Sequence, residues 1–248
     1  GRGPVIKIPT LSFYEYCQLL QLDDMPLLPD HLKITDIPKM ENAEVADLMA
    51  RFEPLVKHFN RYLTIGGFPE LALSDDDLYA QRMLREDVVD KVIKRDVLTL
   101  FKVRSPLLME KLFLYLCMNS TEIFSATTAA KELDNISPNT IESYVDALVK
   151  SNLIYMAYPI AVGSKSVLKG RPKIYIADAA IRNAVLMVDD VLSDERELGL
   201  LIETTVYKHL VSFYQGTGAQ LGYYRKAKEN QKEVDAVIEL PQQTILCE

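Results

Sequence analysis

The 248-residue sequence predicts a mixed α/β fold with more helix than strand. The first observation behind this prediction is that apolar residues recur at helical spacing through most of the chain before residue 150. The second is a series of short strand-like stretches after residue 153, separated by turn and loop residues. The third is the order helix, helix, helix, strand, loop, strand over residues 106–177, which is typical of a winged helix-turn-helix.

The composition excludes several classes of protein. With 48% hydrophobic and 25% charged residues, the chain is too apolar to be disordered. Its net charge of -7 means that any nucleic-acid contact needs a local basic patch. The three cysteines lie far apart, which disfavours disulfides and a zinc site and indicates a cytoplasmic protein. No apolar run approaches the roughly 20 residues of a membrane span, so we expect no membrane contact.

The N-terminal part predicts a short strand over residues 5–8. A helix then begins at Ser12, whose side chain caps the first turn while Glu15 completes a capping box. Residues 22–40 contain several prolines and no clear period, so we expect a long loop there.

Helical spacing resumes at Glu41 and continues until Gly66 and Gly67 end the helix. A second helical region is expected over residues 76–101. Beyond it, the pattern predicts three helices and two strands, over residues 106–118, 126–133, 139–151, 154–160 and 173–177.

The last part of the chain predicts two helices followed by a three-stranded meander. These elements are expected over residues 181–187, 198–214, 220–225, 233–240 and 244–248. The sequence opens with Gly-Arg-Gly-Pro and closes inside a predicted strand, so we expect a fragment of a longer protein. It contains no G-x-x-x-x-G-K-[ST] phosphate loop, so this fragment is not expected to bind ATP in that way.

Three carboxylates near the C-terminus are candidate catalytic residues. Glu203 lies within a predicted helix, Asp235 on a strand and Glu248 at the end of the next strand. A helix packed on a meander would bring them together, and such a cluster suits Mg²⁺, which can activate water for phosphodiester cleavage. Asp235 and Glu248 are the candidate metal ligands. The alternative is that all three are ordinary solvated or terminal charges.

The predicted wing carries a basic cluster that is a candidate nucleic-acid contact. Its members are Lys165, Lys169, Arg171 and Lys173. The outward face of the third helix instead presents Glu142 and Asp146, whose charge disfavours phosphates and base edges. Two interpretations stay open, namely DNA contact through the wing and a wing that is solvated or contacts protein.

A glycine pair and an arginine form a third candidate feature. Gly66 and Gly67 precede Phe68-Pro69-Glu70, which indicates a rigid helix break. Arg95 is followed by Asp96, so it forms an internal salt bridge or presents its guanidinium to a phosphate. Helical periodicity does not choose between these roles.

Taken together, these stretches resemble a prokaryotic AAA-type ATPase family (AAA_14-like) that carries a C-terminal DUF4143 domain. The resemblance covers nearly the whole chain, and its parts occur in the family's order and spacing. The motifs are Gly1-Arg2, Leu11-Ser12-Phe13-Tyr14-Glu15-Tyr16, Gly66-Gly67-Phe68-Pro69-Glu70, Arg95-Asp96-Val97, Lys173 to Asp178, Gly199 with Glu203, Tyr223-Tyr224-Arg225, Glu233-Val234-Asp235 and Leu246-Cys247-Glu248.

The resemblance implies a parent protein with an N-terminal P-loop domain that uses ATP and Mg²⁺. It also implies that Glu203, Asp235 and Glu248 match the carboxylates of a PD-(D/E)xK nuclease-like fold, truncated before the lysine expected two residues after Glu248. Arg2 falls where the family places an arginine shortly after its sensor strand, so it is a candidate nucleotide-proximal residue together with Arg95.

We therefore expect three regions. Residues 1–72 are the last strand and helical lid of the ATPase domain, residues 73–178 are a linker helix and winged-helix module, and residues 179–248 are the truncated nuclease-like domain. The function expected is a regulatory, DNA- or partner-contacting arm of an ATPase; the alternatives are a metal-dependent nuclease and a non-catalytic protein-interaction scaffold. Expected partners are DNA through the wing, the chain's own P-loop domain and a second copy of the chain.

Overall fold

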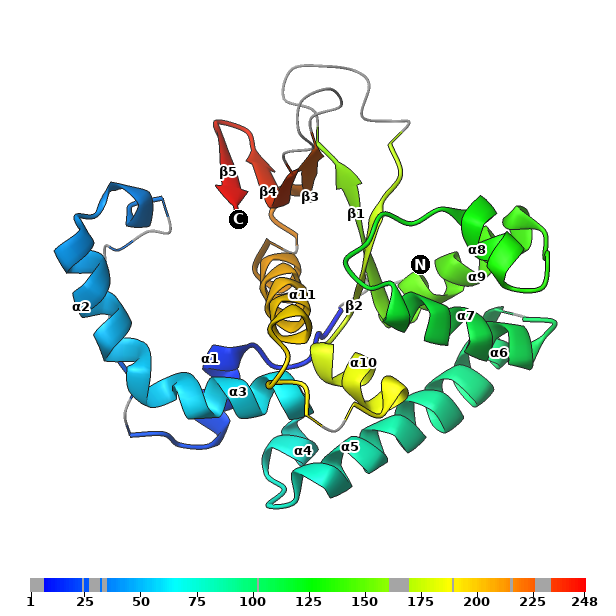
Figure 1. The fold of residues 1–248 in the computed structure, drawn as a ribbon, viewed down its shortest axis with the longest axis horizontal. Coiled ribbons are helices and arrows are strands. Elements are labelled where there is room, and N and C mark those ends of the chain that lie inside the picture. The colour runs from blue at the N-terminus through cyan, green and yellow to red at the C-terminus, as the bar shows by residue number, and fades with distance from the viewer. Residues whose placement is uncertain are drawn as a thin grey trace, which may run out of the picture.

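The structure is a computed structural model that describes residues 7–23, 25–26, 32, 35–101, 103–160, 170–188, 190–214, 216–225 and 233–248. It is a mixed α/β chain, rich in helix, with one five-stranded sheet, as the sequence predicts (Figure 1). Lys7 and Ile8, the described half of the first predicted strand, belong to no strand.

The N-terminal helices differ from the prediction at one proline. Helix α1 (Phe13–Leu19) begins at Ser12 with the predicted capping box. After the short 3₁₀ turn η1 (Ile37–Lys39), the helix expected from Glu41 is divided into α2 (Asn42–Phe52) and α3 (Val56–Ile65) by the 3₁₀ turn η2 (Glu53–Leu55). Pro54 lies in that turn and has no N–H to donate, so an uninterrupted helix is disfavoured there.

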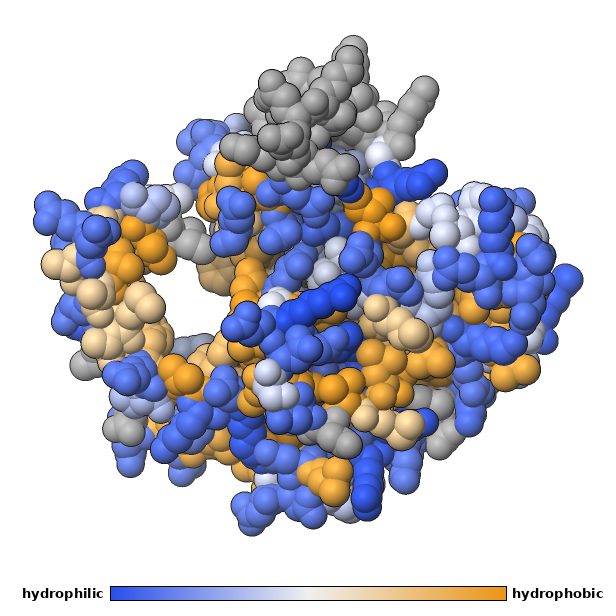
Figure 2. Space-filling view, in the orientation of Figure 1, coloured by the Kyte–Doolittle hydropathy of each residue, from blue (hydrophilic) through white to orange (hydrophobic). Residues whose placement is uncertain are grey.

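Helix α2 stands away from the rest of the molecule. It buries none of its residues, and Figure 2 shows an opening between it and the body of the protein. Met49 is 69% exposed on this helix.

The predicted helical region over residues 76–101 is confirmed as α5 (Asp77–Glu86), the π-helical stretch η3 (Asp87–Val97) and α6 (Leu98–Phe101), preceded by the short α4 (Pro69–Ala72).

The middle of the chain has the predicted order of elements. Its helices and strands are α7 (Pro106–Met118), α8 (Ala126–Glu132), α9 (Pro138–Lys150), β1 (Ile154–Pro159) and β2 (Lys173–Ile176). Ser105 and Ser125 cap α7 and α8, because each side chain accepts a hydrogen bond from the N–H three residues later. Leu112, Ile141 and Leu148 are fully buried in the core that these helices share with β1 and β2.

The C-terminal part also follows the predicted order. It consists of α10 (Ala179–Leu186), α11 (Glu195–Tyr214), β3 (Gln220–Arg225), β4 (Glu233–Leu240) and β5 (Gln243–Cys247). Within the described part of the chain, no helix combines the length and the apolar character needed to cross a membrane.

All five strands form one sheet in the order β2-β1-β3-β4-β5. Strands β1 and β3 pair in parallel, and every other neighbouring pair is antiparallel. The sheet therefore continues across the expected boundary at residue 178, with β2 and β1 on one side and the meander of β3, β4 and β5 on the other. Tyr175 of β2, Tyr207 of α11 and Ile238 of β4 share a core beneath it.

Candidate functional site

The sheet brings two of the three predicted carboxylates together around a lysine. Lys173 begins β2, Glu203 lies on α11 and Asp235 lies on β4. The Lys173 Nζ atom is 3.1 Å from Glu203 Oε1 and 3.1 Å from Asp235 Oδ1. It is also 2.5 Å from Oε1 of Glu233. We call these four residues the lysine–carboxylate cluster.

Burial and hydrogen bonding fix the charges of this cluster. The Lys173 side chain is only 5% exposed. Burial opposes its charged form, but hydrogen bonds to Glu233 and Asp235 and the charge of Glu203 outweigh that effect and raise the pKa of Lys173. Burial raises the pKa of Glu203, against the attraction of Lys173 and a 2.7 Å hydrogen bond donated by the Tyr175 hydroxyl. The raised pKa of Lys173 favours its ammonium form at neutral pH.

These residues as placed do not fit the expected Mg²⁺. The ammonium sits where the three carboxylates converge, and a second cation there would be repelled at close range. No group of three or more His, Cys, Asp or Glu side chains in the described residues is suited to hold a metal ion. Glu248 is exposed and directly follows β5, which ends with Cys247 paired to Ala236.

The structure places the four basic residues of the predicted wing in different surroundings. Lys173 faces the interior rather than solvent, because β2 joins the sheet that carries Asp235. Arg171 is exposed, and its carbonyl accepts a 2.8 Å hydrogen bond from the Tyr223 hydroxyl. Lys165 and Lys169 lie outside the described residues.

Of the two candidate nucleotide-proximal arginines, the structure describes Arg95. Arg95 Nε donates to Asp96 Oδ1 at 2.8 Å, and the Arg95 side chain is 71% exposed on η3. The internal salt bridge is thus the contact that Arg95 makes in this structure. Arg2 lies outside the described residues.

A second buried ion pair, not predicted as a site, joins four distant segments of the chain. Lys208 of α11 donates to Asp178 Oδ2 at 2.7 Å, and the two side chains are 2% and 3% exposed. The same ammonium donates to the Tyr62 hydroxyl at 2.7 Å and to the Leu11 carbonyl at 2.9 Å. Asp178 Oδ2 also accepts from the Thr10 hydroxyl at 2.7 Å. We call this set the Asp178–Lys208 node.

The glycine pair before Phe68 is explained by this node. The Gly67 N–H donates to Asp178 Oδ2 at 3.1 Å, and the Leu11 N–H donates to the Gly67 carbonyl at 2.7 Å. A Cβ atom on Gly66 would lie 2.4 Å from Asp178 Oδ1, and one on Gly67 would lie 2.1 Å from the Leu11 oxygen. Gly66 also has a φ of 76°, which favours glycine.

His209 extends the node by one residue along α11. Its Nδ1 is 2.6 Å from the Thr205 carbonyl, and the Phe13 N–H donates to its Nε2 at 2.8 Å. Nε2 must therefore be unprotonated, so the ring is neutral with its proton on Nδ1. Burial lowers the pKa of His209, which favours the same neutral form. Two consecutive residues of α11 thus hold the segment that leads into α1.

Sequence reasoning missed this node because its members are far apart in the chain. Asp178 belongs to one of the motifs that carry the family resemblance, and Lys208 has no role in the sites predicted from the sequence. No sequence pattern distinguishes this lysine, and the structure shows that it is buried beside Tyr207, Thr204 and Thr205. A lysine is seldom buried without a partner, so this position required a carboxylate that spacing alone did not identify.

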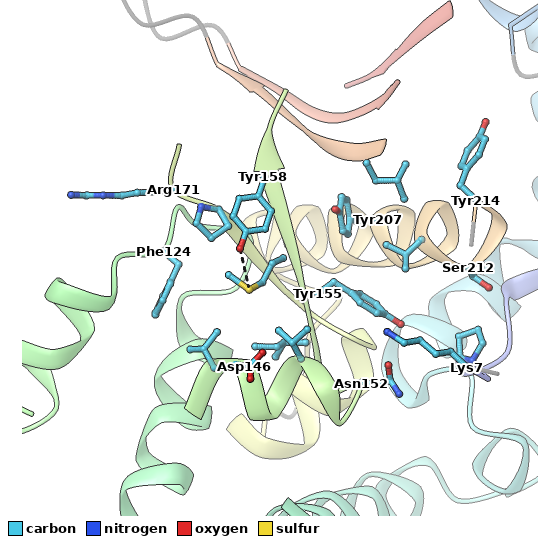
Figure 3. A pocket seen from close by; sticks show the side chains of 18 of the residues that line it. Lys7, Phe124, Asp146, Asn152, Tyr155, Tyr158, Arg171, Tyr207, Ser212 and Tyr214 are labelled. Atoms are coloured by element: carbon cyan, nitrogen blue, oxygen red, sulfur yellow. Dashed lines mark hydrogen bonds between the residues drawn. The ribbon is translucent and has the colours of Figure 1, made fainter. Parts of the chain in front are cut away.

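A large cavity lies between α9, β1, α11 and the start of β3. Its volume is about 1100 Å³. Figure 3 shows tyrosine side chains from β1 and α11 around it, with Arg171 and Lys7 in different parts of its border. Tyr155 and Tyr158 of β1 and Tyr207 and Tyr214 of α11 contribute to the lining. We call it the tyrosine groove.

Comparison with known proteins gives two family matches. A family model described as "Domain of unknown function (DUF8612)" matches residues 56–192, and one described as "Domain of unknown function (DUF4143)" matches residues 198–248. The second match confirms the predicted DUF4143 resemblance for that region. No solved structure matches the chain.

Two similar proteins come from Methanocaldococcus jannaschii. Uncharacterized protein MJ1544 is 24% identical over 185 residues, which cover 72% of this chain and 40% of the relative. Uncharacterized protein MJ1637 is 30% identical over 175 residues, which cover 69% of this chain and 36% of the relative. The matched part of this chain thus spans about two fifths of the length of these relatives.

Proposed function

This chain belongs to the family described as a domain of unknown function (DUF8612), and we propose that it is a regulatory module of an AAA-type ATPase. The ATPase part of the proposal is supported by the sequence motifs that resemble that family. In this proposal it couples a P-loop domain of the parent protein, which binds ATP and Mg²⁺, to a surface that contacts a partner. It cuts no nucleic acid itself. The relatives are much longer than the matched region, which leaves room for a further domain.

The Asp178–Lys208 node is the observation that carries this proposal. Its hydrogen bonds connect Thr10 and Leu11, which precede α1, to Asp178 and to Lys208 of α11 in the C-terminal part. A buried and fully hydrogen-bonded ion pair holds its partners in one geometry, because separating them exposes uncompensated charge. A displacement of the N-terminal segment is therefore passed to α11 and to the sheet that packs on it.

The lysine–carboxylate cluster argues against the nuclease alternative. The Lys173 ammonium occupies the position where Glu203, Glu233 and Asp235 converge, which is where a metal ion shared by Glu203 and Asp235 would lie. The test is incubation of plasmid DNA with this chain and Mg²⁺ or Mn²⁺, and the expected result is no cleavage. Metal-dependent cleavage that Asp235→Ala abolishes would restore the nuclease assignment.

DNA contact is the less favoured form of partner contact. Arg171 is the one predicted wing cation that is both described and exposed, while Glu142 and Asp146 are exposed on α9. Phosphate contacts would give binding that weakens steeply with salt. If a duplex binds with such a salt dependence and Arg171→Ala weakens it, DNA becomes the partner class.

Coupling is tested by measuring ATP turnover in the full-length parent protein. The variant is Lys208→Met with Asp178→Asn, which removes both charges of the node and leaves neither uncompensated. We expect ATP turnover to change at least 5-fold while nucleotide affinity stays the same. Lys150→Met, on the exposed end of α9, is the matched control and should change neither. A parent that binds no ATP, or a node variant with unchanged turnover, would contradict the proposal.

A further inference from the structure

The tyrosine groove has the lining of a protein-binding surface. Tyr155 and Tyr214 are half-buried and Tyr158 is 49% exposed, so aromatic surface is available within it. Phe124 and Met156 add further apolar surface. Tyrosine, phenylalanine, methionine and arginine are the residue types enriched where proteins bind each other. Its volume of about 1100 Å³ is above the range of about 300–1,000 Å³ that is typical of small-molecule sites.

The walls of the groove carry charges of both signs. Glu142 and Asp146 lie one turn apart on α9. Arg171 lies on the segment before β2, and Figure 3 shows it and Asp146 in different parts of the border of the groove. Asp146 is paired with Lys150 at 2.5 Å. Glu142 and Arg171 are exposed, and neither has an ion-pair partner among the residues that the structure describes. A polyanion would meet repulsion along α9, whereas a segment with one charge of each sign is complementary.

We propose that the tyrosine groove binds a segment of a partner protein that carries an acidic residue and a basic residue on either side of apolar or aromatic side chains. The acidic residue pairs with Arg171, and the basic residue pairs with Glu142 and Asp146 on α9. The apolar side chains pack between them on Tyr155, Met156 and Tyr158 of β1. This inference rests on the proposed function, because it specifies the partner that the module contacts.

The groove also borders the segment that the Asp178–Lys208 node holds. Lys7, Ile8 and Pro9 line the groove, and Thr10 and Leu11 directly after them bind Asp178 and Lys208. A bound partner segment would therefore touch the same stretch of chain that the node fastens to α11. Binding in the groove is therefore linked to the position of residues 7–11, because residues 7–9 line the groove and Thr10 and Leu11 bind the node.

The probe for this inference is a phage-displayed library of random 12-residue peptides, selected on the wild-type chain. We expect the selected peptides to combine an acidic residue, aromatic or large apolar residues and a basic residue. Their synthetic versions should lose at least 10-fold in affinity on Tyr158→Ala and on Arg171→Glu. Tyr79→Ala on α5 and Arg51→Glu on α2 are matched controls, because both are exposed and lie outside the groove, and they should bind as the wild type does.

A second selection tests the charge pairing. Panning on the Arg171→Glu variant should return peptides in which the acidic residue is replaced by a basic one. The inference is overturned if binding is insensitive to Tyr158→Ala and Arg171→Glu, or if the selected peptides show no charge preference. It is also overturned if single-stranded DNA displaces them at physiological salt. A wild-type dimer that dissociates on Tyr158→Ala would assign the groove to a second copy of the chain instead.

These outcomes separate the inference from the proposed function. If the groove variants change no peptide binding but the node variant alters ATP turnover, the partner assignment fails and the coupling role stands. If peptides select as expected while the node variant leaves turnover unchanged, the binding surface stands and the coupling role fails.

Discussion

At the scale of single residues, buried charge organises this molecule. Lys173 and Lys208 are both buried, and each is surrounded by acceptors that compensate for its lost hydration. Burial raises the pKa of the Asp178 carboxyl, but the attraction of Lys208 and its hydrogen bonds outweigh this and lower it. The two lysines therefore act as structural cations of α11, because Lys173 binds Glu203 on this helix and Lys208 belongs to it.

The first prediction concerns the loss of one of these cations. Lys208→Met should lower the free energy of unfolding by about 3–5 kcal/mol, because it leaves the Asp178 carboxylate buried without its partner. Adding Asp178→Asn should recover part of that loss. Lys150→Met, which removes an exposed pair, should cost less than about 0.5 kcal/mol. Urea denaturation measures all three values, and equal midpoints for Lys208→Met and Lys150→Met would contradict the account.

The second prediction concerns pH. The pKa of His209 is lower in the folded chain than the value of about 6.5 expected when unfolded, so the unfolded chain binds more protons as the pH falls. The stabilising contribution of neutral His209 is complete above about pH 6.5 and is lost as the pH falls through the folded pKa. We expect the difference in Tm between wild type and His209→Gln to shrink from pH 7.5 to pH 5.5. A difference that grows on acidification would show that the ring is charged in the folded chain.

At the scale of elements, replacing glycines by alanine tests how closely the turn between α3 and α4 approaches the node. A Cβ on Gly67 would lie 2.1 Å from the Leu11 oxygen and 2.9 Å from Lys208 Nζ, so Gly67→Ala should destabilise the chain by about 1–3 kcal/mol. Gly199 lies in α11 with nothing within 4 Å of such an atom. Gly199→Ala should therefore stabilise the chain by roughly 0.5–1 kcal/mol. Thermal melts distinguish the two, and destabilisation of both would refute the assigned role of Gly67.

The sequence predicted most helices because their signals are local. The capping box at Ser12 and the serine caps of α7 and α8 lie within the segments that they begin. Pro54 indicates the break at η2, but the apolar helical period continues through this proline and predicts one helix. The surroundings of Lys173 were not predictable, because they depend on β2 joining the strands of the meander.

At the scale of the whole molecule, the sheet joins the second and third expected regions, whose residues share the core beneath it. The parallel pairing of β1 with β3 links strands separated by α10 and α11, and its register pairs Tyr158 with Gly222 and Pro159 with Tyr223. Spacing along the chain does not encode such a distant pairing. The fold class was therefore predictable from local periodicity, whereas the continuity of the sheet and the site that it creates were not.

The arm formed by α2 should be the first described helix to open. It buries no residue, so few contacts oppose its local unfolding. Arg51 on α2 is exposed, whereas Arg61 on α3 binds Asp77, the Tyr16 hydroxyl and the Ala72 carbonyl. Limited trypsin digestion followed by mass spectrometry should detect cleavage after Arg51 well before cleavage after Arg61. The reverse order would show that α2 is better packed than this structure indicates.

The central claim is that the segment before α1 and helix α11 move as one unit through the Asp178–Lys208 node. Hydrogen exchange followed by mass spectrometry tests it most directly, because the Leu11 and Phe13 amides donate to Gly67 and His209. We predict that these amides are protected in the wild type and in Lys150→Met, and exchange at least 10-fold faster in the Lys208→Met/Asp178→Asn variant. Unchanged protection of residues 10–13 in that variant would contradict the claim.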